Sequence, residues 1–347
     1  MRGALAKRSL IVLPFLGGLL IVGVVLASSL GAVVVPFDQV ARLLLSRLPG
    51  VEISPTWSEG VEAIILQIRL PRVTSALVVG FALAAAGVIF QGLLRNPMAD
   101  PYIIGTSGGA ALGATVALLL PVQIVWYGFT LVPLAAFVGA LAAVVVVYNL
   151  ARVGPRTPVT TLLLAGFAVS SMLAAVMSFL MMLSGAGLRR IILWTMGGLG
   201  GGRWEQLMIV TPLIVLGMGW SYLYAGDLNA LSLGEEQAAY VGVPVERRKV
   251  TLLILGSLLT AAAVSVSGLV GFVGLVIPHV GRLILGPDHR LLLPAAALLG
   301  GLFLVLSDLL ARLLLAPAEL PVGIITALVG APFFIYLLRR SKREYGF

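Results

Sequence analysis

Long apolar runs alternate along the chain with short stretches that carry most of its charges and many of its prolines. A helix that crosses a membrane needs about 20 predominantly apolar residues, and most of the runs approach or exceed that length. The pattern therefore predicts ten membrane-spanning helices. Their expected ranges are 10–35, 66–93, 102–120, 129–150, 161–183, 206–225, 250–267, 270–285, 291–311 and 322–338.

The first and eighth runs are the least regular. Basic residues precede the first run, as in a signal peptide, but 10–35 is much longer than the apolar region of about 7–15 residues in such a peptide. We therefore expect a retained span. Gly271, Gly274 and Pro278 interrupt the eighth run. The expected fold class is an all-α, polytopic membrane protein with residues 1–347 in a single transmembrane domain.

Composition supports a membrane protein and excludes an ordinary soluble enzyme. Hydrophobic residues make up 60% of the chain and charged residues 11%, against about 45–50% and 25% in soluble domains. The chain has no cysteine, so it has neither disulfides nor a thiol nucleophile.

The net charge of +9 would indicate a nucleic-acid partner in a soluble protein, but here it follows the predicted topology. An even number of spans places both termini on one side. That side would carry 15 basic residues and the opposite side 8, while the acidic residues divide into seven and seven. Because basic residues concentrate in cytoplasmic loops, we expect both termini in the cytoplasm, contact with membrane lipid and no nucleic-acid partner.

Three segments between the spans are longer than simple turns, and one of them is the external, glycine-rich stretch 184–205. Residues 36–67 form an external segment in which apolar residues recur at helical spacing, which predicts an amphipathic helix at the membrane interface. Residues 227–249 form the longest cytoplasmic segment and contain two expected short helices. Ser232 followed by Glu235 resembles a capping box, Gly242 would end that helix, and Pro244 would begin the next. The mixed charge of this loop indicates a docking surface.

Candidates for chemistry are scarce. None of the three lysines follows a glycine, so the chain lacks a phosphate-binding P-loop and is not expected to hydrolyse ATP itself. His279 and His289 have no clustered ligands nearby, so no metal site is expected. Asp308 and Arg312 are spaced for an i,i+4 ion pair.

Two further patterns have a structural and a functional interpretation. Gly105, Gly109 and Gly113 repeat at the spacing that lets membrane helices pack closely, which favours a packing role. Arg69 and Arg72 lie at the outer end of the second span, on the same face of the membrane as Arg312. These arginines either snorkel toward lipid headgroups or form a cationic patch for an acidic docking partner.

A series of motifs in a fixed order gives a more specific interpretation. They are Arg69-Leu-Pro-Arg72, Ala86-Gly-Val-Ile-Phe-Gln-Gly-Leu-Leu-Arg-Asn-Pro-Met-Ala-Asp-Pro101, Gly105-Thr-Ser-Gly-Gly, Leu162-Leu-Leu-Ala-Gly166, Trp194-Thr-Met-Gly-Gly198, Leu231-Ser-Leu-Gly-Glu-Glu-Gln-Ala-Ala, Gly271-Phe-Val-Gly-Leu-Val-Ile-Pro-His279, Gly286-Pro-Asp-His-Arg290 and Ala318-Glu-Leu-Pro-Val-Gly-Ile-Ile-Thr-Ala-Leu-Val-Gly-Ala-Pro332. Together they resemble the permease subunit of type II ABC importers, the iron-siderophore, haem and cobalamin uptake family.

The resemblance implies a homodimer in a bacterial or archaeal cytoplasmic (inner) membrane, with the translocation path at the two-fold axis. Two separate ATPase subunits would bind ATP and Mg, and one extracytoplasmic binding protein would deliver the substrate. This chain would be a transport subunit without a cofactor and without its own ATPase site. The cargo would be a siderophore, haem or cobalamin.

The resemblance also assigns roles to residues at matching motif positions. Docking of the binding protein falls to Arg69, Arg72 and Arg312. An inner gate falls on Val159 and Thr160, although Val159 departs from the small polar residues usual there. Coupling to the ATPase is assigned to Gly234, Glu235, Glu236, Gln237, Ala238, Ala239 and Gly242.

Two other functions remain open at this point. An ion-coupled secondary transporter would have helices broken around a central site, and the interrupted seventh and eighth spans fit that description. A structural scaffold would tolerate substitution of Glu235 and Glu236 without loss of transport.

Overall fold

The computed structural model describes residues 2–31, 33–122, 125–126 and 129–344. Residue 32, within the expected first span 10–35, and the ends of the range 1–347 lie outside the described residues. In the described part, seven helices are long and apolar enough to cross a membrane, and three shorter helices are also apolar. They correspond in order to the ten expected spans, and the all-α polytopic fold class is confirmed.

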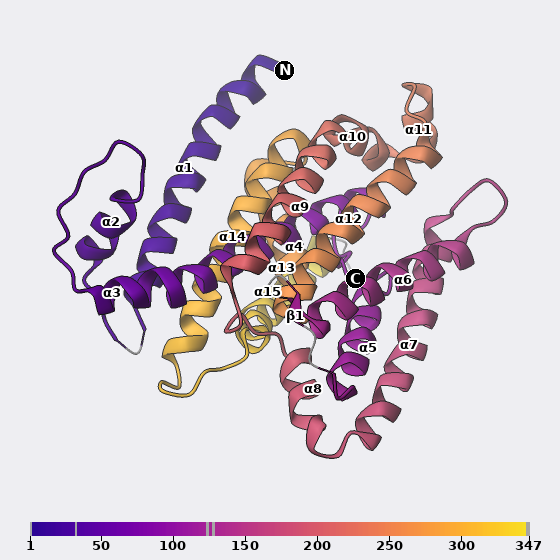
Figure 1. Ribbon diagram of the computed structural model, residues 1–347. Helices are drawn as coiled ribbons and strands as arrows, with labels where there is room; N and C mark the ends of the chain where they lie inside the picture. Colours follow the sequence, from indigo (N-terminus) through magenta and orange to yellow (C-terminus); the bar gives the residue numbers. More distant parts are fainter. Residues whose placement is uncertain (1, 32, 123–124, 127–128, 345–347) are drawn as a thin grey trace.

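The elements follow one another with few long connections (Figure 1). The helices that correspond to the spans are α1 (Arg2–Ser29), α4 (Leu70–Leu93), α5 (Thr106–Leu119), α6 (Leu131–Ala151), α7 (Val159–Leu183), α9 (Trp204–Leu223), α12 (Val245–Ser267), α13 (Val273–Leu285), α14 (His289–Leu313) and α15 (Val322–Glu344). The shorter elements are α2 (Phe37–Leu45), α3 (Glu59–Ala63), the π-helix η1 (Ile64–Arg69), β1 (Val125–Trp126), β2 (Phe129–Thr130), the 3₁₀-helix η2 (Gly185–Gly187), α8 (Leu188–Thr195), α10 (Ala225–Leu233) and α11 (Glu235–Tyr240). Strands β1 and β2 pair antiparallel.

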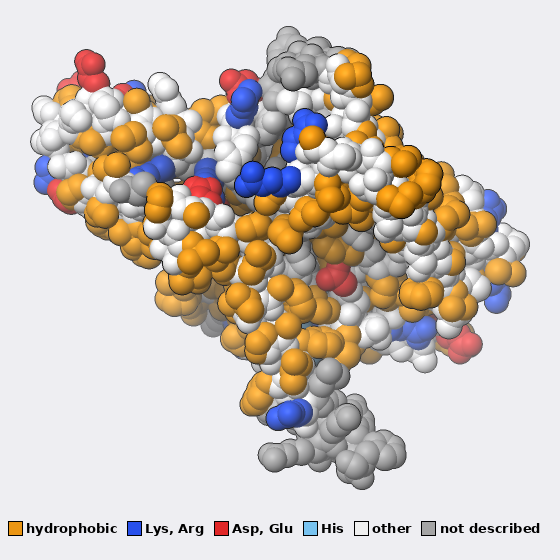
Figure 2. Space-filling model, turned by 90° about the horizontal axis from the view of Figure 1, so that it is seen from below, with side chains coloured by type: hydrophobic (Ala, Val, Ile, Leu, Met, Phe, Trp, Pro, Cys, Tyr) orange, Lys and Arg blue, Asp and Glu red, His pale blue; other side chains and the backbone are white. Residues whose placement is uncertain are grey.

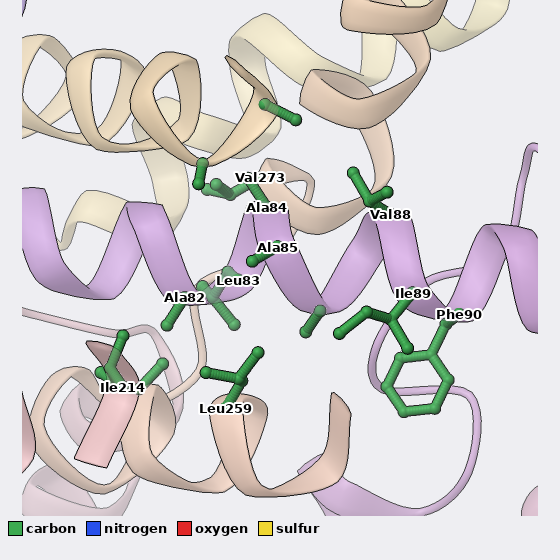
Figure 3. Close-up of a cluster of buried hydrophobic side chains, with 14 of the residues drawn as sticks. Ala82, Leu83, Ala84, Ala85, Val88, Ile89, Phe90, Ile214, Leu259 and Val273 are labelled. Atoms are coloured by element: carbon green, nitrogen blue, oxygen red, sulfur yellow. The ribbon is translucent and has the colours of Figure 1, made fainter. Parts of the chain in front are cut away.

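Helix α4 is the centre of the bundle. Its side chains are buried along almost the whole helix and pack against α14, α12, α13 and α9 (Figure 3). At Gly80 an added Cβ would overlap the backbone of Gly300, and at Gly87 it would overlap Gly274. Small residues permit this approach, because helices in lipid gain stability from close packing rather than from the hydrophobic effect.

The three glycines of the repeated motif do not share one role. An added Cβ at Gly109 or Gly113 would overlap the backbone of α6, so these two glycines bring α5 and α6 together. Gly105 precedes the helix, with φ at +89°, and its added Cβ would make only van der Waals contact with Val147. The motif therefore contributes two packing positions, and Gly105 instead allows the left-handed turn into α5.

Helix α7 has the most exposed apolar surface of the long spans. Leu164, Phe167 and Met182 point outward along it. Hydrophobic side chains also cover most of the face in Figure 2, with charged side chains in small groups. Such a surface requires lipid or another apolar protein surface to cover it.

The expected amphipathic helix of residues 36–67 is present as α2. Its buried residues Val40 and Leu43 pack with Val25, Val35 and Ile65, which belong to the end of α1, the connection to α2 and η1. Its apolar face is thus covered in large part by the chain itself.

The bundle has two ends that are used as reference below (Figure 1). The α11 end holds the start of α1, α10, α11 and the 152–158 connection. The α8 end lies opposite and holds α8 and the 314–321 connection.

Candidate functional site

At the α8 end, two arginines flank one aspartate. Arg72 Nε lies 2.9 Å from Asp308 Oδ1, and Arg312 Nε lies 3.1 Å from Asp308 Oδ2. Arg72 Nη1 also lies 2.8 Å from Glu319 Oε2. The expected pair of Asp308 and Arg312 is confirmed. Together with Arg69, these residues are called the arginine cluster below.

Two of these arginines bind the end of α1. Arg69 Nη1 donates hydrogen bonds of 2.9 and 3.0 Å to the carbonyls of Ser28 and Ser29. Arg312 donates to the carbonyls of Ala27, at 2.8 Å, and Leu30, at 3.1 Å. The last carbonyls of a helix lack partners within the helix, and cations there also interact favourably with its dipole. The arginine cluster therefore fixes the first span at the α8 end.

Accessibility differs within the arginine cluster. Arg69 is 7% exposed and Arg312 9% exposed, and both direct their donors inward. Arg72 instead reaches Glu319, whose side chain is about half exposed. The structure thus brings the three expected docking arginines together, and Arg72 is the one paired with an exposed acid. Sequence reasoning missed Glu319, although it stands in the quoted motif that begins at Ala318.

A cavity of about 630 Å³ lies at the junction of α5, α8, α15 and the break between α12 and α13. The backbone segments around it meet at glycines. An added Cβ at Gly197 would overlap Leu269, and one at Gly323 would overlap Met196. Phe272 lines the cavity with φ at +68°, a conformation rare outside glycine. Non-helical backbone at membrane depth is tolerated where it is buried in protein or lines a water-filled path. The break between α12 and α13 thus places non-helical backbone beside this cavity.

The loop at the α11 end has an inner and an outer side. Glu235 faces inward and Ala238 is fully buried. Glu236, Gln237 and Ala239 are exposed. Tyr240, which sequence reasoning did not select, is 89% exposed and forms an apolar surface with its neighbour Val241.

The expected capping box in this loop was wrong. Ser232 lies within α10, and its hydroxyl donates to the carbonyl of Leu228 at 2.8 Å, so it cannot cap α11. Gly234, with φ at +136°, stands at the N-cap position. Gly242, with φ at +88°, lies beyond the end of α11, and Pro244 precedes the first residue of α12. The angular turn at Gly234 thus separates the two helices.

The expected gate residues begin α7. Val159 is the first residue of that helix and is half-buried, while Thr160 is exposed. Both follow the 152–158 connection, at the same end of the bundle as α11.

Asp288 and His289 join α14 to α10. The carboxylate of Asp288 accepts hydrogen bonds from the backbone of Arg290, at 3.0 Å, and from the side chain of Asn229, at 2.8 Å. Burial would raise the pKa of Asp288, but these two bonds and the charge of Arg290 outweigh it and lower the pKa. His289 Nδ1 lies 2.7 Å from Asn229 Oδ1. No group of three or more metal-ligating side chains exists among the described residues.

Comparisons with known proteins give the same picture over most of the chain. Residues 19–340 match the FecCD transport family. The cobalamin import system permease protein BtuC of Halobacterium salinarum is 50% identical over 281 residues, which cover 81% of this chain and 74% of that protein. The hemin transport system permease protein HmuU of Yersinia pestis is 44% identical over 288 residues, 80% of this chain and 84% of that protein.

A solved structure extends the likeness to three dimensions. An inward-facing structure of the metal-chelate type of ABC transporter superposes with a TM-score of 0.80 at 31% identity, covering 94% of this chain and 98% of that one. Ten apolar helices among the described residues, together with these relatives, define a multi-pass permease subunit of an ABC importer in the cytoplasmic membrane. The chain belongs to the FecCD transport family. These relatives are permeases of ABC importers, and none of them favours an ion-coupled secondary transporter.

Proposed function

We propose that this chain forms the translocation path for an iron chelate, haem or cobalamin and that ATP hydrolysis by a separate subunit drives the path open. The observation that carries this proposal is the exposed side of α11, which projects from the bundle in Figure 1. Tyr240 and Val241 leave apolar surface there, and Glu236 is exposed on the same helix. A surface of this kind indicates a protein partner.

The proposed partner at the α11 end is an ATPase subunit that binds ATP and Mg. Gly234, Glu236, Gln237, Ala239 and Gly242 would lie at or near the contact. Closure of two ATPase subunits upon ATP would shift α11 and rearrange the helices as rigid bodies. The α11 end is cytoplasmic in this proposal, in agreement with the excess of basic residues assigned to that side by sequence.

The α8 end would receive a substrate-binding protein from outside the cell. Arg72 is the foremost docking residue, since its guanidinium lies beside exposed Glu319. Arg69 and Arg312 would support the docking surface by holding α1 in place.

The chain would act as a homodimer. The apolar outer face of α7 offers surface for a second copy or for lipid. The cavity of about 630 Å³ and its mainly apolar lining suit a chelate that makes few specific contacts. Val159 and Thr160 at the start of α7 would then close the path at the cytoplasmic end.

Reconstituted vesicles test this proposal. The complex is assembled from this chain, its ATPase and its binding protein, and uptake of ferric siderophore, haem and cobalamin is measured separately. We expect uptake of one of them only with ATP on the ATPase side. Uptake driven by an ion gradient in the absence of the ATPase would overturn the proposal.

A further inference from the structure

Lys249 is a buried cation at the α11 end. It is 6% exposed and lies in the first turns of α12. Its Nζ atom lies 3.0 Å from the carbonyl oxygen of Thr157, 3.0 Å from Glu235 Oε2 and 2.8 Å from Glu246 Oε1. Two of the three N–H donors of this ammonium group are hydrogen-bonded to Thr157 and Glu235, and Glu246 adds a second ion pair.

Each of the three acceptors belongs to a different part of the chain. Glu235 begins α11, Glu246 lies on α12 itself, and Thr157 belongs to the connection that leads into α7. Lys249 therefore links the loop that faces the proposed ATPase to the segment that precedes the proposed gate.

Thr157 is held at two points. Its carbonyl accepts from Lys249, and its backbone N–H donates to Glu246 Oε2 at 3.1 Å. Pro158 follows, and Val159 is the first residue of α7. Lys249 and Glu246 thus both bind the backbone two residues before the helix begins.

The Lys249 side chain is shielded from most water, whereas the side chains of Glu235 and Glu246 are about one third exposed. A neighbouring cavity lined by Leu93, Leu94 and Val159 has a volume of only about 10 Å³, about the minimum needed to hold one water molecule. Hydrogen bonds between charged groups are stronger in such a site than in water. Separating a buried cation from its acidic partners is costly, which favours movement of the group as one unit.

We propose that Lys249 is a positioning residue that transmits the movement of α11 to the start of α7, with Glu246 holding Thr157 to it. This inference rests on the proposed function, since it assumes that an ATPase moves α11 and that α7 carries the gate. Glu235 then acts inward, on Lys249, while Glu236 faces the partner.

The test compares Lys249→Met with Arg247→Met in the assembled complex in vesicles. Arg247 is an exposed cation on the same helix, two residues away, and is the matched control. We expect Lys249→Met to lower ATP-driven uptake about tenfold while the ATPase rate changes less than about twofold. Arg247→Met should leave both rates near wild type. Lys249→Arg keeps the charge but replaces the compact ammonium group with a rigid, planar fork, so it should restore only part of the uptake.

A second variant keeps the test decisive if Lys249→Met fails to fold. Lys249→Met leaves two carboxylates without a cation, and adding Glu246→Gln removes one of them. We expect this double variant to lose as much uptake per ATP hydrolysed as Lys249→Met alone. Unchanged uptake, or a parallel fall of uptake and ATPase rate, would overturn the inference. Wild-type uptake that does not depend on ATP would instead overturn the proposed function.

Discussion

Both ends of the bundle bury charged side chains, but the binding partners of these side chains differ between the two ends. In the arginine cluster, Arg69 and Arg312 are bound to carbonyls at the end of α1, and Asp308 lies between two guanidinium groups. At the α11 end, Lys249 is bound to two glutamates and to the connection before α7. The first group holds a helix end, and the second joins a loop to a helix start.

The chemistry of the side chains suits this difference. A guanidinium group presents five donors in a rigid, planar fork, whereas an ammonium group is a compact charge on a flexible stem. Arginine can therefore saturate several fixed carbonyls at once, and lysine can follow partners that move. We infer that the α8 end is a fixed frame and that the α11 end transmits movement.

Substitution of Asp308, the aspartate in the arginine cluster, should have the largest effect on stability at the α8 end. Asp308 is 1% exposed and lies between Arg72 and Arg312. Asp308→Ala leaves both cations without this partner, and we expect a loss of about 3–5 kcal/mol in stability. Thermal unfolding in detergent measures it, with Ser307→Ala at the adjacent buried position as the control. Equal unfolding midpoints for the two variants would contradict this role for Asp308.

Arg69→Gln should loosen the end of α1 locally. The substitution removes the donors that bind Ser28, Ser29 and Val33, and an unpaired buried polar group costs about 1–3 kcal/mol. We expect faster hydrogen exchange in residues 26–31 than in wild type. Arg203→Gln, at an exposed position near the same end, should leave exchange in that segment unchanged. If both variants exchange like wild type, the anchoring role of Arg69 is wrong.

Arg72 and Glu319 should have opposite effects on docking of the binding protein. Arg72→Gln removes the proposed docking charge, and we expect binding to weaken about tenfold at low salt, with less difference at high salt. Glu319→Gln frees Arg72 from its own acid and should strengthen binding a few-fold. Surface-based binding kinetics measure both. Weaker binding of Glu319→Gln would show that this carboxylate contributes to docking instead of competing with the partner.

The smallest predicted effect concerns the link between α14 and α10. Because the pKa of Asp288 is lowered in the folded protein, its contribution is present above its unfolded value of 3.8 and is lost as the pH falls through the lower, folded pKa. Asp288→Ala should cost about 1 kcal/mol at neutral pH and progressively less in acid. Unfolding midpoints of wild type and Asp288→Ala, measured at neutral pH and in acid, test this. Asp288→Asn retains an oxygen acceptor and should cost less than Asp288→Ala, and a pH-independent loss for Asp288→Ala would contradict the assignment.

The sequence predicted the spans well because their apolar runs are long and separated by charge. It also predicted the pair of Asp308 and Arg312, which depends only on helical spacing. The contacts of Arg69 and Arg312 with α1 could not be predicted, because they depend on tertiary packing and join residues at least 40 positions apart.

In the loop at the α11 end, sequence spacing also failed to predict the local structure. Ser232 and Glu235 have capping-box spacing, but the turn at Gly234 places Ser232 in the preceding helix and directs Glu235 toward Lys249. Glu235 therefore pairs with Lys249, which is distant in the sequence, instead of forming a capping box with Ser232. Gly105 similarly fits a packing motif by spacing but adopts a left-handed turn.

The central claim is that α11 and the start of α7 move together while the α8 end stays fixed. The chain has no cysteine, so spin labels can be placed at Tyr240→Cys on α11, Thr160→Cys on α7 and Leu313→Cys at the end of α14. Distances are measured for each pair in vesicles, with labelled chains diluted by unlabelled copies, before and after ATP binding. We predict that the distance from residue 240 to residue 160 stays constant while both distances to residue 313 change. In Lys249→Met, the distance from 160 to 313 should no longer change, whereas the distance from 240 to 313 should still change. A wild-type distance from 240 to 160 that changes as much as the other two would contradict the claim.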